Sequence, residues 1–192
     1  MTPLPEKNDP VTQKELGRYK VEIALILIAA IMSAVISVAV FNYQSYLTDK
    51  NEQRNLATGY LLEIENVGPP LVKFIAFNAS MNATEFRPAV PMDNFYPAYG
   101  LYYSNRADIS KFDPQTSASL YRFYYHLLRA DDQRKMFSDF DTVYAVKNGN
   151  PGDPAANGTL KKEIYLHMVD DLNQSVTEIP QLKLQLQNYA AG

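Results

Sequence analysis

Residues 23–41 read IALILIAAIMSAVISVAVF, and this uncharged run decides how the rest of the chain is interpreted. Its only polar side chains are Ser33 and Ser37. A helix needs about 20 apolar residues to cross the roughly 30 Å hydrocarbon core of a bilayer, and the run has that length. We therefore predict a transmembrane helix over residues 21–42, with the lipid bilayer as its first partner. A cleaved signal peptide is the alternative, because residues 37–39 (SVA) match a small-x-small rule, but the run is longer than usual for one.

The segments on either side of this run predict its orientation. Residues 1–20 contain three prolines and dispersed charges, which predicts a disordered tail. The bases near the run are Lys7, Lys14, Arg18 and Lys20 before it, and Lys50 and Arg54 after it. Because basic residues concentrate on the cytoplasmic side, we expect a signal anchor in the cell membrane, with the tail cytoplasmic and residues 43–192 outside.

Size and composition limit what the outer region can be. The 192 residues leave room for one modest domain after the run, and the formal net charge of −3 comes from interspersed acids and bases. That charge pattern predicts no nucleic-acid partner. Cysteine is absent, which excludes disulfides, thiolate catalysis and thiolate metal sites.

Apolar spacings of three and four predict that residues 43–192 form a mainly α bundle of three or four helices. Gly68-Pro69-Pro70 is expected to kink or break the first of these helices, which should end near Phe77, because each proline lacks an amide donor. Asp113-Pro114 predicts the start of another, with an aspartate cap followed by proline. Residues 147–158 (KNGNPGDPAANG) predict a loop, and the last long helix is expected to bend or split at Pro180.

The helix that follows Asp113 carries two apolar stripes. One includes Leu120, Tyr124, Leu127 and Leu128, and the other includes Met136, Phe137, Phe140, Val143 and Tyr144. The stripes are rotated about 160° from one another on a straight helix. We therefore expect a break or bend across residues 131–135, and residues 142–146 are a weak candidate for a strand.

Tyrosine is unusually frequent, with 14 residues, while tryptophan is absent. Residues 94–103 hold Tyr96, Tyr99, Tyr102 and Tyr103 in a segment broken by proline and glycine, which predicts a loop. Clustered tyrosines offer ring faces and hydroxyls together, as in a pocket for a sugar or a flat ligand. The alternative is that these rings fill the end of a helical bundle.

Four N-x-S/T sequons follow the apolar run, at Asn78, Asn82, Asn157 and Asn173. Their position on one side of the span is what glycosylation outside the cell would require. The alternative is that they are unused sequons in a polar chain.

Within the run, Ala29, Ser33 and Ser37 recur every four residues. Small residues at this spacing let two helices approach closely in lipid, which predicts a packing seam for self-association or for a partner helix. The alternative is that alanine and serine are common in membrane helices.

Residues that carry chemistry are few. Glu163, His167 and Asp171 are spaced by four along one helix and are the best candidates for metal ligands. The Glu-x-x-His spacing of di-iron bundles does not occur, and a solvated helix flank explains the row more simply. His126, between tyrosines and leucines, is interpreted as a hydrogen-bonded histidine at the core boundary. Neither a nucleophile elbow nor a phosphate-binding glycine loop is present, so we predict no catalytic, cofactor or metal site.

Gly17, Glu22, the long apolar helix and Tyr43-Gln44-Ser45-Tyr46 together resemble the N-terminal signature of type IV pilins. The resemblance covers about thirty residues and implies cleavage after the glycine and polymerisation through the apolar helix. Arg18 and Lys20 stand where pilins are apolar.

Taken together, these features predict a single-pass anchored protein that acts as a non-catalytic interaction subunit, structural subunit or adaptor. Its expected partner is another membrane or envelope protein, or a second copy through the span. One alternative is an extracytoplasmic ligand-sensing or ligand-binding domain that uses residues 94–103. A further alternative is a pilin-like surface subunit.

Overall fold

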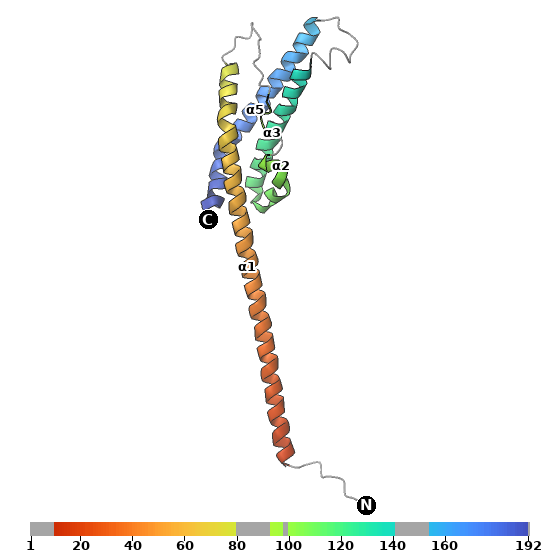
Figure 1. Cartoon of the computed structure of the whole chain (residues 1–192), viewed down its shortest axis with the longest axis vertical. Helices are drawn as coiled ribbons and strands as arrows, with labels where there is room; N and C mark the ends of the chain where they lie inside the picture. Colours follow the sequence, from red (N-terminus) through yellow and green to blue (C-terminus); the bar gives the residue numbers. More distant parts are fainter. Residues whose placement is uncertain (1–9, 80–92, 98–99, 141–153, 192) are drawn as a thin grey trace, which may run out of the picture. The chain divides into compact units, whose positions relative to one another are not determined.

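The computed structural model describes residues 10–79, 93–97, 100–140 and 154–191, and the chain in these ranges is almost entirely helical (Figure 1). The elements are α1 (Pro10–Ala79), α2 (Leu101–Asn105), the 3₁₀ helix η1 (Arg106–Lys111), α3 (Pro114–Asp139) and α5 (Pro154–Ala191). No strand occurs in these ranges, which confirms the mainly α class. The chain divides into two compact units, the first ending at Asn51 and the second beginning at Glu52.

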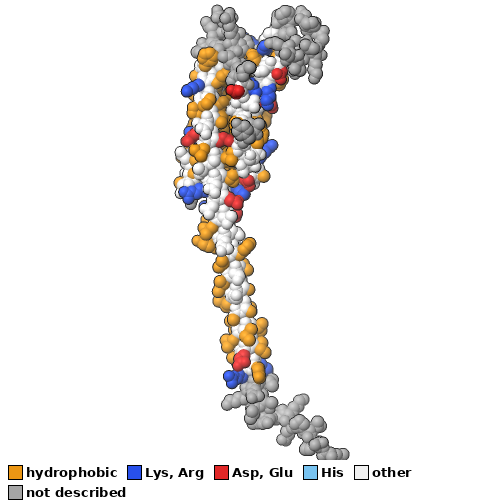
Figure 2. Space-filling model, in the orientation of Figure 1, with side chains coloured by type: hydrophobic (Ala, Val, Ile, Leu, Met, Phe, Trp, Pro, Cys, Tyr) orange, Lys and Arg blue, Asp and Glu red, His pale blue; other side chains and the backbone are white. Residues whose placement is uncertain are grey.

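The first unit holds the apolar run as part of α1. This helix is long and apolar enough to cross a membrane, judged by length and composition, and none of its most apolar 18-residue window is buried. Ile26 is 68% exposed and Phe41 is 67% exposed, and Figure 2 shows apolar side chains all along this stretch. The helix begins at Pro10, so half of the predicted disordered tail (residues 1–20) is helical instead, because residues 11–20 contain no proline and continue the helix of the run.

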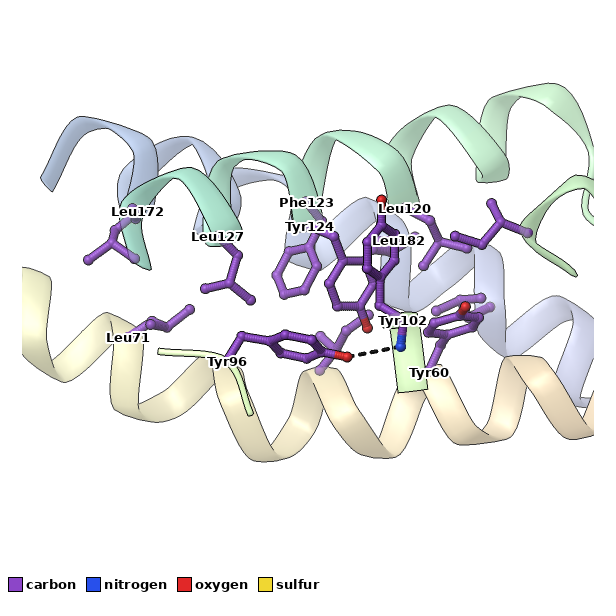
Figure 3. Packing of buried hydrophobic residues seen from close by; sticks show 14 of the residues in the cluster. Tyr60, Leu71, Tyr96, Tyr102, Leu120, Phe123, Tyr124, Leu127, Leu172 and Leu182 are labelled. Carbon is purple, nitrogen blue, oxygen red and sulfur yellow. Dashed lines mark hydrogen bonds between the residues drawn. The ribbon is translucent and has the colours of Figure 1, made fainter. Parts of the chain in front are cut away.

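The second unit has one hydrophobic core shared by residues 52–79 of α1 and by α3 and α5 (Figure 3). Each helix contributes buried side chains at spacings of three and four, which is the pattern that the sequence predicted. These are Ala57, Tyr60, Ile64 and Leu71 from α1, Leu120, Phe123, Tyr124, Leu127 and Ala130 from α3, and Tyr165, Met168, Leu172, Leu182 and Leu186 from α5.

A break of the helix at residues 68–70 is wrong, because α1 continues through Pro69 and Pro70, and it ends at Ala79, close to the expected end near Phe77. Each proline removes the amide that would bond to the carbonyl four residues earlier, on Glu65 and Asn66. Both of these residues are exposed, so water can bond to the two carbonyls that lose their donor. The two prolines therefore destabilise the helix less on this exposed face than they would if these carbonyls were buried.

The expected split at Pro180 is also wrong, since α5 is one helix from Pro154 to Ala191. Pro180 is exposed and its neighbours Leu182 and Leu186 are fully buried, so core packing on the opposite side holds the helix across the proline. Residues 154–158 of the predicted loop are helical instead, because Pro154 with its preset φ begins α5. Residues 141–153, including the strand candidate, lie outside the described residues.

The expected break in α3 at residues 131–135 does not occur either. Asp131 and Arg134 are buried and form an ion pair of 2.9 Å, so they continue the inward stripe that leucines begin. Arg134 also donates to Asn94 Oδ1 at 2.6 Å, and the backbone N–H of Phe95 donates to Asp131 at 3.0 Å. The prediction failed because it followed only the apolar side chains and left out these two buried charged residues.

The start of α3 is confirmed. The Asp113 carboxylate accepts hydrogen bonds from the backbone N–H groups of Gln115 at 2.8 Å and Thr116 at 3.1 Å, and Pro114 is the first helical residue. The Thr116 hydroxyl also donates to Asp113 at 2.5 Å. Together with the two backbone bonds, this hydroxyl lowers the pKa of the Asp113 carboxyl.

Candidate functional site

The tyrosine-rich segment folds inward around one carboxylate, that of Glu63 on α1. Glu63 Oε1 accepts from the hydroxyl of Tyr96 at 2.8 Å and from the hydroxyl of Tyr124, and its Oε2 accepts from the backbone N–H of Leu101 at 2.6 Å. The Tyr96 hydroxyl in turn accepts from the backbone N–H of Tyr102 at 2.9 Å, the bond drawn in Figure 3. We call these five residues the Glu63 cluster.

The rings of this cluster pack against one another. Tyr102 stacks on Tyr124 with centroids 4.4 Å apart, and Tyr96 meets the edge of Tyr124 at 5.3 Å. Burial, reinforced by the nearby Glu63, raises the pKa of Tyr96 and Tyr124 above the usual value for tyrosine. Both phenols therefore remain protonated donors at neutral pH.

Gly100 is required by the closeness of this packing. The ring of Tyr96 lies where a Cβ on residue 100 would be, and the Gly100 N–H donates to the Pro97 carbonyl at 2.9 Å. The short helix α2 begins directly after the glycine. Part of the segment predicted as a loop is thus helical.

The four tyrosines proposed from the sequence as a pocket are placed differently from one another. Tyr96 is 2% exposed and Tyr102 is 4% exposed, and both belong to the core. Tyr103 is 52% exposed, and Tyr99 lies outside the described residues. Of the described three, Tyr102 borders the groove on the neighbouring face of α3.

This groove has a volume of about 560 Å³ and lies between α3 and the α2–η1 segment. We call it the tyrosine–arginine groove. Its α3 residues recur at spacings of three and four, which places them on one helix face. It is lined by Tyr102, Arg106, Tyr121, Arg122, Tyr125, Leu128, Arg129 and Asp132.

Two arginines of the groove are held in place by carboxylates of α5. Arg122 donates through Nε at 2.8 Å and Nη2 at 3.2 Å to the two oxygens of Glu178, and Nη2 also donates to Ser119 Oγ at 3.1 Å. Arg129 lies 3.3 Å from Asp171 through Nε and donates through Nη1 to the Tyr125 hydroxyl at 3.4 Å.

The third arginine has a different partner. The guanidinium of Arg106 lies over the ring of Tyr102, 5.8 Å from its centroid, a cation–π arrangement. Among the described residues, no carboxylate lies within ion-pair distance of Arg106. Of the three arginines that line the groove, Arg106 is the one without a carboxylate partner in the described part of the chain.

The row Glu163, His167 and Asp171 does not converge on one point. Glu163 and His167 are exposed, whereas Asp171 is 4% exposed and faces α3, where its Oδ1 lies 2.8 Å from His126 Nδ1. No group of three metal-ligating side chains of the His, Cys, Asp and Glu types is found within the described ranges. The row is split between solvent and the α3–α5 interface.

The proposed packing seam lies on the surface of α1. Ala29, Ser33 and Ser37 are all exposed, and the Ser37 hydroxyl donates to the Ser33 carbonyl at 2.8 Å within the helix. The Ser37 hydroxyl therefore has a hydrogen-bond acceptor within its own helix, and the small side chains remain accessible to another helix.

The sequon asparagines differ in their surroundings. Asn78 is half-buried, its amide donates to the Phe74 carbonyl at 2.7 Å, and its Oδ1 accepts from the Tyr165 hydroxyl. Asn173 is exposed on α5, while Ser175 of the same sequon is buried and donates to the Phe123 carbonyl at 2.8 Å. Asn82 lies outside the described residues, and Asn157 falls within α5.

No family model matches the chain, and no curated protein and no solved structure is significantly similar to it. The resemblance of the N-terminal segment to type IV pilins stays a prediction from about thirty residues.

Sequence reasoning missed the groove and the Glu63 cluster. A signal for the groove was present, because Tyr121, Tyr125, Leu128 and Asp132 follow helical spacing on a face of α3 that is turned about 100° from Leu120, Tyr124 and Leu127. No comparable signal marked Glu63, since a single glutamate on an amphipathic helix is normally a surface residue.

Proposed function

We propose that the protein is a single-pass membrane protein, with residues 21–42 in the bilayer, the N-terminus in the cytoplasm and the helical unit outside. The observation that supports this most is the exposure of the whole apolar stretch of α1. A core helix of a soluble protein would be covered by other elements, whereas side chains such as Ile26 and Phe41 meet no cover among the described residues. Lipid is the solvent that such a surface requires.

We propose further that the helical unit acts by contact, as a non-catalytic subunit or adaptor. Tyr121 and Tyr125 are 41% and 57% exposed, next to Arg122 and Arg129 on one face of α3. Tyrosine and arginine are the residue types enriched at the energetic centres of protein interfaces. The partner that this suggests is another membrane or envelope protein.

Accessibility labelling tests the anchoring and the orientation, and it is simple because the chain has no cysteine. Asn173→Cys is the outer probe, on an exposed position of α5, and Lys7→Cys is the matched probe in the N-terminal tail. A membrane-impermeant maleimide should label residue 173 in intact cells and residue 7 only after lysis. The reverse pattern overturns the orientation, and recovery of the full chain in the soluble fraction without detergent overturns the anchor.

A second candidate function is ligand binding by the outer unit, and the tyrosine–arginine groove favours it. Mild detergent extraction separates the two candidates. A partner recovered in stoichiometric amount supports the contact role, whereas a purified chain that lacks a partner and is stabilised by a small ligand supports the binding role.

A further inference from the structure

We infer that the tyrosine–arginine groove binds a small ligand that joins one carboxylate to a flat ring. The inference rests on the second candidate function, ligand binding by the outer unit. The groove volume of about 560 Å³ lies within the range of about 300–1,000 Å³ that small-molecule sites occupy. Its walls combine exposed aromatic faces with guanidinium groups, which are complementary to a ring and to an anion respectively.

The ring-binding part of the groove comes from α3. Tyr121 and Tyr125 stand one turn apart and present rings that are 41% and 57% exposed, and the half-buried Leu128 continues the same face. The buried Tyr102 adds an aromatic surface from α2. Rigid rings such as these lose little conformational entropy when a flat ligand stacks on them.

The charge balance of the groove favours a monoanion. Arg122 is neutralised by Glu178 and Arg129 by Asp171, while Asp132 is paired with Lys135 at 3.8 Å. Arg106 is left with its contact to the Tyr102 ring and no carboxylate among the described residues. One unbalanced positive charge matches a carboxylate better than a dianionic phosphate.

The two paired arginines prepare the site for the same ligand. Glu178 occupies Nε and Nη2 of Arg122, and Asp171 with Tyr125 occupies Nε and Nη1 of Arg129. Each guanidinium plane is thus held in one orientation while it keeps one terminal nitrogen without a described acceptor. A pre-oriented donor loses less entropy on binding than a free surface side chain does.

Benzoate and benzamide are suitable probes because they have almost the same shape and differ in charge. Each is titrated into the full chain in detergent, with binding measured by nuclear magnetic resonance shifts of the tyrosine ring signals. We expect benzoate to bind with a Kd at least about tenfold lower than that of benzamide. Inorganic phosphate is titrated in parallel and should bind more weakly than benzoate.

Arg106→Gln is the diagnostic variant, and Arg54→Gln is its control, an exposed arginine outside the groove. Arg106→Gln should raise the Kd for benzoate about tenfold and leave that for benzamide unchanged, whereas Arg54→Gln should change neither. Tyr125→Leu should weaken both probes, which reports the ring contact separately from the charge. Unchanged circular dichroism of each variant confirms that the fold is retained.

The outcomes separate the ligand class from the binding function. Equal affinity for benzoate and benzamide, or an Arg106→Gln variant that binds benzoate as the parent does, overturns the carboxylate assignment. Tighter binding of phosphate at the same residues overturns the ligand class and keeps ligand binding. Absence of saturable binding for all three probes overturns both this inference and the second candidate function. It does not affect the proposed membrane anchor, which the labelling experiment tests separately.

Discussion

Replacing Glu63 by glutamine should destabilise the second unit strongly, because one carboxylate accepts three hydrogen bonds there. Glutamine keeps only one acceptor oxygen. Its NH₂ group replaces the other oxygen and faces a hydrogen-bond donor that Glu63 accepts from. The loss of one charge-assisted bond costs about 1.5–3 kcal/mol, and the weakening of the other two adds roughly 0.5 kcal/mol each. We expect a total of about 3 kcal/mol, against a typical stability of about 5–15 kcal/mol for a domain.

The assay is urea unfolding of the full chain in detergent, followed by the near-ultraviolet circular dichroism of the tyrosines. Glu65→Gln is the matched control, two residues along the same helix, where the carboxylate is 52% exposed and lies 3.6 Å from Lys183. Loss of the Glu65 charge should lower the free energy of unfolding by less than about 0.5 kcal/mol. If the two variants differ by less than that amount, Glu63 does not hold the cluster.

A double-mutant cycle locates the effect within the cluster. Tyr124→Phe removes one of the hydroxyl donors to Glu63 without changing the stacking of the ring on Tyr102. Residues in one hydrogen-bond network are expected to show a coupling energy of about 1 kcal/mol. Additive effects of Glu63→Gln and Tyr124→Phe would contradict a direct bond between the two side chains.

Three further predictions concern the same unit. Asp113→Ala removes the cap of α3 and should cost about 1 kcal/mol in urea unfolding. Hydrogen bonds lower the Asp113 pKa in the folded state, so the stability that the carboxylate contributes is present above the ordinary carboxyl pKa of about 4 and is lost as pH falls through the lowered value. A loss of unfolding free energy in Asp113→Ala that does not change with pH would contradict this prediction. Gly100→Ala should lower the free energy of unfolding by about 1–3 kcal/mol, because the new Cβ displaces the Tyr96 ring. Gly158→Ala is the control and should stabilise α5 slightly, because there is open space around its Cβ. Equal effects of the two substitutions would contradict the close contact between Gly100 and the Tyr96 ring. Burial raises the pKa of Tyr60, Tyr96 and Tyr124. The stability that these tyrosines contribute is therefore complete below the ordinary tyrosine pKa of about 10 and is lost as pH rises through the raised values. In a pH titration, tyrosinate absorbance should rise in two steps, first for exposed tyrosines and then together with unfolding, and a single step would contradict the prediction.

The sequence was sufficient for the features that depend on local patterns. The helical class, the apolar run and the cap at Asp113 follow from periodicity, length and a two-residue motif, and each requires only neighbouring residues. The three expected helix breaks failed for a shared reason. Pro69, Pro70 and Pro180 are on exposed faces, and the 131–135 region is held by an ion pair, so tertiary context outweighed local preference.

The candidate site was harder to predict because its partners are far apart in the chain. Glu63 meets Tyr124 across a sequence separation of 61 residues, and Arg122 meets Glu178 across 56. A hydrophobic pattern reports which face of a helix turns inward, but not which polar group on another helix will meet it. The buried Asp171 shows the same limit, since the row that contains it was interpreted as a solvated helix flank.

The distribution of tyrosines on α3 connects the two sites. Tyr124 is fully buried and serves the Glu63 cluster, while Tyr121 and Tyr125 are largely exposed and line the groove. Adjacent residues on a helix differ by about 100° in direction, so the same short segment supplies both faces. The inner ring is explained by packing and by its bond to Glu63. The outer rings are not part of the core, although Tyr125 contacts the ring of His126 and accepts a hydrogen bond from Arg129. Their exposed faces beside oriented guanidinium groups are the surface on which the proposed ligand would stack.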